Sequence, residues 1–414
     1  MKILCVHNRY QHLGGEDLAA KVEMQLLESH GHTVELFEAD NAAIVGVSAQ
    51  LKAALGTVYS PSAKKRFAAK IRSYEPDLVH VFNFFPLLSP SIHYACREAG
   101  VPVIQKISNF RLLCPSALLL REGRVCEDCV GKLVPWPGVL HGCYRDSRVG
   151  SAVVATMLAT HRLMGTWEKV VDGYIARTNF SRDKLVQGGL PAGKIDIIPS
   201  FAHDPGDPSD SREGNGGFAL FAGRLTPEKG IATLLSAWDR LKGVPIRLKV
   251  VGGGPLSGEV ARRSAGGNVD YLGELSRAEV QSLMGEAAFL VFPSACYENF
   301  PLAIVEAFAA GVPVIASRLG AMEEIVEDGR TGLHFTPSDA EDLAGKVEWA
   351  WRHPKETKEM GRNARAEYLA KYTPERNYQL MMQMYERVLM ARGLTTRSVA
   401  AATEGGSIKE DPRQ

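Results

Sequence analysis

The sequence predicts an α/β protein with two doubly wound, Rossmann-like domains that face each other across a central cleft. The chain has 414 residues, too many for one ordinary hydrophobic core. In both halves, short apolar runs typical of buried strands alternate with helix-like segments, and this rhythm is typical of parallel sheets. A stretch rich in Pro, Gly, Asp and Ser at residues 204–217 separates the halves and predicts a linker.

The N-terminal domain is expected to span residues 1–203. Its first helix is predicted over Asp17–His30, closed by Gly31. Its predicted strands are Lys2–His7, Thr33–Ala39, Leu78–Phe82, Val101–Ile107, Gly173–Thr178 and Lys194–Pro199.

The C-terminal domain is expected over residues 218–372. Capping boxes at Ser276-x-x-Glu279 and Ser338-x-x-Glu341 predict two helix starts. A last helix at 373–392 is expected to pack back on the N-terminal domain, and the polar tail at 393–414 to be disordered. The predicted strands are Phe218–Ala222, Ile246–Val251, Val269–Leu272, Phe289–Phe292, Val312–Ala316 and Gly332–Phe335, and two late helices are predicted over Lys355–Lys371 and Pro374–Met390.

Composition excludes several classes of protein. The net charge of +1 gives no support to nucleic-acid binding. Met1–His7 is too short and strand-like for a signal peptide, and the apolar stretch Ser151–Thr160 is too short to span a bilayer. Seven cysteines, an odd number, without an export signal indicate a reducing compartment. We therefore expect a cytoplasmic protein.

Two carboxylates, Glu298 and Glu306, are separated by seven residues around a predicted helix start. Pro301 suits the first turn of a helix and Gly311 its end, so a helix is predicted from about Pro301 to Ala310. Glu298 then lies in the loop at the carboxyl edge of the sheet, where open α/β sheets bind ligands. The two glutamates can meet different parts of one ligand.

A pair of cations follows the first strand of the second domain, in Gly223-Arg224-x-x-x-x-Lys229-Gly230. A helix is expected to start near Pro227, and helix N-termini attract anions, so Arg224 and Lys229 could grip a diphosphate. Alone, the segment is equally consistent with surface charge. Its place on the same edge as the two glutamates favours a binding site.

The first strand of the N-terminal domain ends in a second glycine loop. Gly14 and Gly15 would let the backbone approach a ligand, with Asp17 capping the next helix. A tight turn between strand and helix explains the same residues without any ligand.

Taken together, these motifs resemble glycosyltransferase family 4, in a branch with an insertion at 112–145 in the N-terminal domain. The resemblance covers Met1 to about Arg392 and implies the GT-B fold, a nucleotide-diphosphate sugar as donor and retention of anomeric configuration. The matching pieces are His7-Asn8, Gly14-Gly15-Glu16-Asp17, Gly223-Arg224, Lys229-Gly230, Glu298 and Glu306.

The resemblance also implies roles for single residues. Glu298 would face the donor sugar, Glu306 the ribose, and Arg224 with Lys229 the phosphates. No Asp-x-Asp pair occurs in the sequence, so no catalytic metal is expected. Further donor contacts are implied at Gly14, Gly15, Gly223, Leu272, Asn299, Phe300, Pro301 and Leu302.

The segment Ser108-Asn-Phe-Arg111 departs from the family pattern. Related sequences usually carry a His at the first position, near the reacting sugar, and Ser108 cannot supply a cationic group. Either activity or the donor differs, or the reaction never needed that His. Ser108 and His7 are the candidate sugar-proximal residues of this domain.

Four cysteines of the insertion, Cys114, Cys126, Cys129 and Cys143, have the spacing C-x11-C-x2-C-x13-C. Four thiolates suit a closed, tetrahedral structural zinc site. Reduced buried cysteines or a redox pair are the alternatives.

The motifs predict a glycosyltransferase that acts on a hydroxyl acceptor, which could be a glycan, a lipid-linked intermediate or a small molecule, with glycan or polysaccharide biosynthesis the expected setting. A nucleotide-sugar epimerase or hydrolase, and a non-catalytic nucleotide-binding homologue, are the alternatives. Lys64, Lys65, Arg66, Lys70 and Arg72 could touch an anionic membrane surface, or form a solvated helix face.

Overall fold

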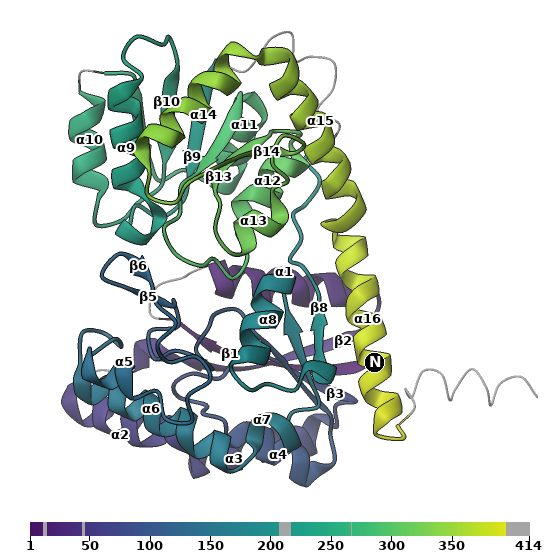
Figure 1. Ribbon diagram of the computed structural model, residues 1–414. Helices are drawn as coiled ribbons and strands as arrows, with labels where there is room; N and C mark the ends of the chain where they lie inside the picture. The colour runs from purple at the N-terminus through teal and green to yellow at the C-terminus, as the bar shows by residue number, and fades with distance from the viewer. Residues whose placement is uncertain (11–14, 44–45, 207–216, 266, 395–414) are drawn as a thin grey trace, which may run out of the picture.

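The computed structural model describes residues 1–10, 15–43, 46–206, 217–265 and 267–394. Two α/β domains lie one above the other and are joined by two passages of the chain (Figure 1). Most of the predicted linker, residues 207–216, and the tail from 395 lie outside the described residues. The predicted class, two doubly wound parallel-sheet domains, is confirmed.

The N-terminal sheet has six parallel strands in the order β2-β1-β3-β4-β7-β8. Each matches a predicted strand, with ends shifted by a few residues. The strands are β1 (Lys2–Arg9), β2 (Thr33–Asp40), β3 (Leu78–Asn83), β4 (Val103–Lys106), β7 (Gly173–Ala176) and β8 (Ile195–Ile197).

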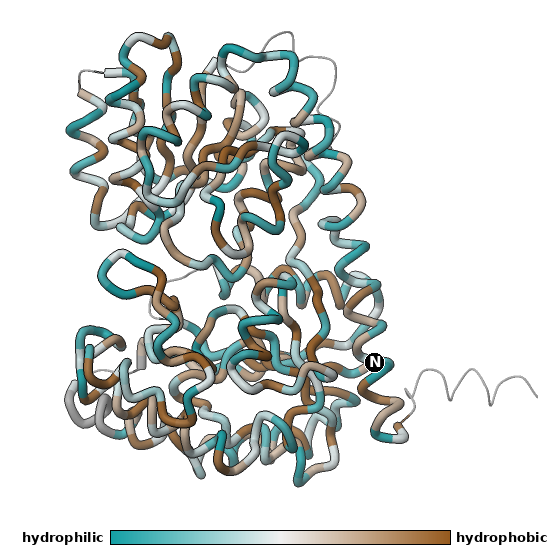
Figure 2. Tube along the Cα trace, viewed as in Figure 1, coloured by the Kyte–Doolittle hydropathy of each residue, from teal (hydrophilic) through white to brown (hydrophobic). Residues whose placement is uncertain are grey.

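Helices pack on this sheet, and the apolar segments of the chain gather inside the domain (Figure 2). The helix α1 begins at Gly15, earlier than predicted, so Asp17 lies in its first turn and does not cap it. The helices are α1 (Gly15–Ser29), α2 (Gly46–Val58), α3 (Pro61–Tyr74), α4 (Ser91–Ala99), α5 (Trp136–Leu140), α6 (Arg148–Leu163), α7 (Thr166–Lys169) and α8 (Asn179–Gln187).

The C-terminal sheet has six parallel strands in the order β11-β10-β9-β12-β13-β14. The first strand in sequence, β9, is therefore central, and the chain reverses direction across the sheet between β9 and β12. Ligands of open α/β sheets bind at such a switch point. The strands are β9 (Phe218–Ala222), β10 (Arg247–Val251), β11 (Val269–Gly273), β12 (Phe289–Phe292), β13 (Val314–Ser317) and β14 (Gly332–Phe335).

Of the two helix starts predicted for this domain, one is confirmed and the other is wrong. Ser276 forms the predicted capping box with Glu279. The prediction for Ser338 is wrong: Asp339 caps α14 through its carboxylate, and Ser338 has a positive φ of 64° one residue earlier. The helices are α9 (Ile231–Arg240), α10 (Ser257–Ser264), α11 (Arg277–Glu286), α12 (Leu302–Ala309), α13 (Ala321–Ile325), α14 (Ala340–Arg352), α15 (Pro354–Lys371) and α16 (Pro374–Ala391).

The last helix, α16, leaves the C-terminal domain and runs along the N-terminal one (Figure 1). The Tyr385 hydroxyl lies 2.5 Å from His80 Nδ1 in the N-terminal core, and Tyr378 stacks on His30 at 3.7 Å between ring centroids. The helix therefore ties the domains together on the side away from the hairpin of β5 (Leu120–Arg121) and β6 (Arg124–Val125) (Figure 1). Among the described residues, no helix is both long and apolar enough for a bilayer span.

Candidate functional site

The carboxyl edge of the C-terminal sheet brings Lys229 and Glu298 together from loops that are distant in sequence. Lys229 Nζ lies 2.6 Å from Glu298 Oε1, and the Ser294 hydroxyl donates to the same oxygen at 2.5 Å. Both charged side chains are mostly buried, 19% and 13% exposed. A pair shielded this far from water interacts more strongly than a surface pair. Glu298 thus fixes the position of the ammonium group.

The residue after Glu298 has an unsatisfied amide. Within the described part of the chain, neither polar atom of the buried Asn299 amide has a hydrogen-bond partner. Such groups are costly unless a ligand or water satisfies them. Helix α12 begins three residues later, and no side chain caps its N-terminus at Pro301. The loop therefore offers amide and backbone groups for a ligand beside Glu298.

The loop that carries Lys229 differs from the prediction. Pro227–Lys229 form a single 3-10 turn, and α9 begins only at Ile231. Gly230 separates the two with φ of 74°, and a Cβ there would lie 1.8 Å from the Pro293 carbonyl oxygen. Only glycine allows this approach, which presses the Lys229 loop against the strand end that leads to Glu298.

Glu306 lies one turn into α12 and faces a different group. Its carboxylate is 3.5 Å from Arg277 Nη2, and it lines a small cavity with His203 and Gln281. Burial raises the pKa of Glu306, with Arg277 opposing the shift. Glu298 and Glu306 therefore have separate cationic partners, as expected if they meet different parts of one ligand.

The remaining predicted donor residues lie around this edge. Arg224 is 72% exposed, and its closest carboxylate is Glu228 at 3.8 Å, so the guanidinium is accessible to a ligand. The Gly223 N–H donates to the carbonyl of Val251, the last residue of β10, at 3.0 Å, and Leu272 near the end of β11 is 37% exposed. Phe300 is half-buried against the core of this domain.

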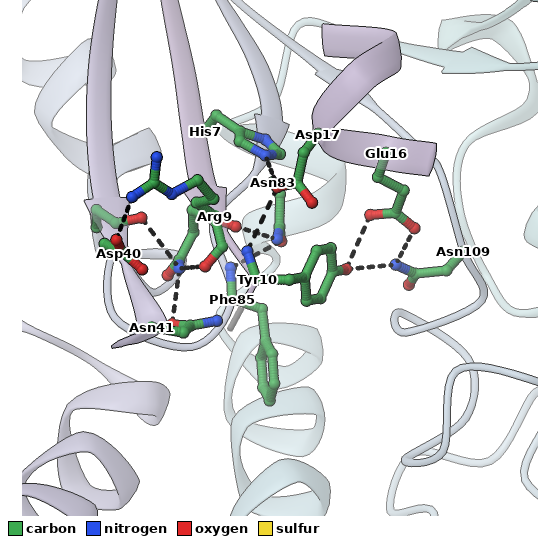
Figure 3. A network of polar contacts seen from close by, with 12 residues as sticks. His7, Arg9, Tyr10, Glu16, Asp17, Asp40, Asn41, Asn83, Phe85 and Asn109 are labelled. Carbon is green, nitrogen blue, oxygen red and sulfur yellow. Dashed lines mark hydrogen bonds and ion pairs between the residues drawn. The ribbon is translucent and has the colours of Figure 1, made fainter. Parts of the chain in front are cut away.

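On the facing edge of the N-terminal sheet, the end of β1 is held by a polar network (Figure 3). His7 Nε2 bonds Asp17 Oδ1 at 2.8 Å, both side chains being about 5% exposed. The Tyr10 hydroxyl donates to Glu16 at 2.8 Å, and the Asn109 amide donates to the same carboxylate at 3.0 Å. Asp17 thus orients His7. Gly15 starts α1, and Gly14 lies outside the described residues.

Ser108 accepts a hydrogen bond from Arg177 Nη2 at 2.8 Å. Arg177 follows β7, is 8% exposed and also donates to Ser200 at 2.6 Å. Beside it, the buried Lys106 is ion-paired with Glu23 of α1. Burial lowers the pKa of Lys106 to about 8. The position at which the sequence departs from the family 4 pattern thus carries a hydroxyl that is hydrogen-bonded to a buried guanidinium.

A cavity at this edge is lined by aromatic rings and polar groups, including Tyr10, Ser108, Asn109 and Arg111. The Arg111 guanidinium lies 4.6 Å from the Phe85 ring centroid and 5.1 Å from that of Tyr144. Aromatic faces with hydrogen-bonding groups around them suit a sugar ring.

The two edges are linked by direct contacts across the cleft. Glu324 of α13 accepts hydrogen bonds from the backbone N–H groups of Asn179 and Phe180, both at 2.8 Å, at the N-terminus of α8. The Phe180 ring lies 4.6 Å from that of Tyr297, the residue before Glu298. The cleft is closed at this point.

The four insertion cysteines line one small cavity, and none forms a disulfide. As the side chains stand, no group of three or more His, Cys, Asp or Glu residues in the described part of the chain is arranged to hold a metal ion. The thiols thus surround the cavity without being drawn together. The zinc site stays a prediction.

Several functional candidates were missed by sequence reasoning. Arg177, Lys106 and Glu23 form the buried charged network, and Glu324 bridges the domains. The sequence could have pointed to Lys106, because a charged residue inside an apolar strand must find a buried partner. The sequence could not have pointed to Glu324, since its role depends on how the two domains meet.

Fold and site together define a GT-B architecture with a charged site at the cleft. A family model described as "Glycosyl transferases group 1" matches residues 207–367, the C-terminal domain. An uncharacterized glycosyltransferase of Methanocaldococcus jannaschii is 32% identical over 179 residues, 42% of this chain and 50% of the relative. D-rhamnosyltransferase WbpZ of Pseudomonas aeruginosa is 34% identical over 161 residues, 38% of this chain and 42% of the relative. The chain spans about half the length, or less, of these curated relatives.

Solved structures match almost the whole chain. HepE of Anabaena, in complex with UDP, has a TM-score of 0.65 at 20% identity, covering 94% of this chain and 100% of HepE. Sucrose-phosphate synthase of Thermosynechococcus elongatus has a TM-score of 0.67 at 19% identity, covering 94% and 99%. These likenesses extend the GT-B fold to the N-terminal domain.

Proposed function

We propose that this protein is a glycosyltransferase that moves a sugar from a nucleotide-diphosphate donor to a hydroxyl acceptor. The observation that carries the proposal is the Lys229–Glu298 pair at 2.6 Å, beside the unsatisfied Asn299 amide at the switch-point edge. It lies inside the segment that matches the group 1 glycosyltransferase model. WbpZ, a named rhamnosyltransferase, is 34% identical to this chain over 161 residues.

The donor would bind across the C-terminal edge. Glu306 would accept hydrogen bonds from the ribose, and Glu298 with the Asn299 amide would hold the sugar hydroxyls. Lys229 and the accessible Arg224 would hold the two phosphates. Backbone N–H groups near Pro301, at the uncapped start of α12, would add donors to the phosphate or sugar.

In the reaction, the bond between the sugar's anomeric carbon and the diphosphate oxygen breaks, and a bond to the acceptor oxygen forms. The departing diphosphate takes the acceptor proton. Negative charge grows on the leaving group, so Lys229 and Arg224 stabilise the transition state more than the ground state. Retention follows from the resemblance to family 4, with the acceptor approaching the face that the diphosphate leaves.

The acceptor would enter from the N-terminal edge, where aromatic rings and polar groups line the cavity beside Ser108. Ser108 is already bound to Arg177, so its hydroxyl would act as a hydrogen-bonding group and not as a base. A glycan, a lipid-linked intermediate and a small molecule remain the candidate classes. Membrane contact through α3 is a weaker proposal, because Lys64 and Lys70 are ion-paired with Glu98 and Glu35.

A donor screen tests the proposal. UDP-, GDP- and ADP-sugars are compared by thermal shift, then by nucleotide release with mixed acceptors. We expect one donor class to stabilise the protein and to turn over only with an acceptor. The product's anomeric configuration tests retention, and activity that does not rise when Mg²⁺ or Mn²⁺ is added to metal-free buffer tests independence from a catalytic divalent ion.

Other outcomes of the screen separate the alternatives. Free or epimerised sugar formed without acceptor would replace the proposal with a hydrolase or epimerase. Calorimetry that detects no nucleotide-diphosphate binding would reject the donor site altogether. Binding without turnover for any acceptor would indicate a non-catalytic homologue.

A further inference from the structure

We propose that the four cysteines of the insertion bind one zinc ion, which holds this part of the N-terminal domain in shape beside the cleft. Residues 112–145 contain four of the seven cysteines, and all four side chains line the same cavity. Borderline-soft Zn²⁺ prefers four thiolates in a closed tetrahedral site. The metal would therefore be structural.

The insertion has too little core to hold its own shape. Its regular structure is one short helix, α5, and a hairpin of two-residue strands, β5 (Leu120–Arg121) and β6 (Arg124–Val125). Five large apolar side chains are more than 40% exposed, namely Leu118, Leu133, Val134, Trp136 and Leu140. Small modules that bury so little apolar surface are usually stapled by a metal or disulfides.

The backbone already brings the cysteines to one place. Cys126 N–H donates to the Leu119 carbonyl at 2.8 Å, and Cys143 N–H to the Gly138 carbonyl at 2.9 Å. A Cβ on Gly138 would lie 2.7 Å from the Pro115 side chain, so the chain segments are packed as closely as glycine allows. Zinc binding would require the cysteine side chains to rotate between staggered χ1 positions, because as they stand they line the cavity without forming a metal-holding group.

Positively charged side chains near the cavity also favour cysteine thiolates there. Binding converts four thiols and one Zn²⁺ into a tetrathiolate complex of net charge −2, and four protons go to solvent. Arg121 lines the cavity and is paired with Asp128 at 2.7 Å. Arg162 packs on the same insertion and donates to the Leu112 carbonyl at 2.8 Å. These two guanidinium groups would offset the charge.

The zinc site would reach the catalytic edge through Glu127, which lies between Cys126 and Cys129. Glu127 Oε1 is 2.7 Å from Lys184 Nζ, and the carboxylate hydrogen-bonds Tyr297, the neighbour of Glu298. Figure 1 shows the β5–β6 hairpin rising toward the C-terminal domain. Glu127 is thus a positioning residue, a role that rests on the proposed function, whereas metal binding does not.

Metal analysis of the full chain tests the site without reference to activity. We expect about one zinc per chain, and tetrahedral Co²⁺–thiolate absorption after cobalt exchange. Cys126→Ser with Cys129→Ser should lose the metal, whereas Cys96→Ser, a buried cysteine outside the cluster, should keep it. If the double variant fails to fold, the reactive thiols of the wild type are counted with and without chelator. Four additional thiols in the presence of chelator would show that a metal holds these cysteines.

Two results would overturn the zinc site: wild-type protein that takes up no zinc when reconstituted reduced, or a native mass showing the four cysteines as disulfides. Glu127→Gln then tests the positioning role separately. It should retain zinc yet lower kcat several-fold with little change in KM. An unchanged kcat with zinc bound would remove the link to Glu298 and leave the metal site intact.

Discussion

The two facing edges of the cleft carry charge in different ways. On the C-terminal edge, Lys229 and Glu298 form a pair that is partly accessible, and Arg224 is 72% exposed. On the N-terminal edge, Lys106, Glu23 and Arg177 are buried and bonded within the domain. The C-terminal edge is therefore arranged to receive a charged ligand, whereas the N-terminal network mainly fixes the cavity wall around Ser108.

The matches to known proteins also differ between the two domains. The group 1 glycosyltransferase model matches residues 207–367, whereas the likeness to HepE, at 20% identity, covers 94% of the chain and so includes the N-terminal domain. Under the proposed function, the C-terminal domain holds the donor and the N-terminal domain holds the acceptor, whose binding loops diverge faster than the scaffold. Mutations on the C-terminal edge should therefore act on chemistry, and those on the N-terminal edge on stability.

The largest effect is expected for Lys229→Ala. Loss of the ammonium group leaves charge on the departing diphosphate unbalanced, and kcat should fall roughly 10²- to 10³-fold, as for removal of other preorganised electrostatic groups. The dissociation constant for the donor should change less. Steady-state kinetics with calorimetry separates the two quantities.

Lys242→Ala is the matched control, because Lys242 is an exposed lysine of the same domain. It should leave kcat within about twofold. Equal losses of activity in both variants, or none in Lys229→Ala, would show that the C-terminal edge is not the site of chemistry.

On the N-terminal edge, Ser108→Ala should cost stability. It leaves a hydrogen-bond donor of the buried Arg177 without its acceptor, at about 1–3 kcal/mol of unfolding free energy. Denaturant unfolding measures the loss, with the exposed Ser282→Ala as control. A variant that is as stable as the wild type but has lost most of its activity would instead place the Ser108 hydroxyl in the reaction.

Nucleotide binding should depend on pH through Glu306. Burial raises the pKa of this carboxyl, and the ribose needs its charged, accepting form. Affinity should therefore fall as pH decreases through the raised pKa, at a higher pH than for an exposed glutamate. Calorimetry from about pH 8 to about pH 5 tests this.

Glu306→Gln distinguishes the titration of the Glu306 carboxyl from the titration of the nucleotide's phosphate groups. The amide cannot ionise, so the variant should bind roughly tenfold more weakly at neutral pH, about 1.4 kcal/mol, and show only the pH dependence of the nucleotide itself. Parallel pH profiles for variant and wild type would exclude Glu306 from the ribose site.

The sequence predicted the sheets well because buried parallel strands need continuous apolar runs, which are visible in one dimension. Glu298 and Lys229 were predicted as neighbours because strand ends of one parallel sheet must meet at one edge. Two local details were predicted wrongly. The turn that begins at Pro227 is 3-10 and ends at Gly230, whose φ is 74°, so α9 begins only at Ile231. Asp339, not Ser338, caps α14. Partners from different domains, such as Glu324 with α8, cannot be inferred from local pattern.

The smallest effect is expected at that domain contact. Glu324→Gln removes a negative charge from the N-terminus of α8, where it accepts hydrogen bonds from Asn179 and Phe180. A charge in this position contributes about 0.3–1 kcal/mol, so the closed arrangement should weaken and KM for the donor rise about two- to fivefold. The effect should shrink with added salt, because the contact is exposed. Glu323→Gln, an exposed glutamate on the same helix, is the control. If both variants behave alike, surface charge and not closure explains the change, and the two edges meet without help from Glu324.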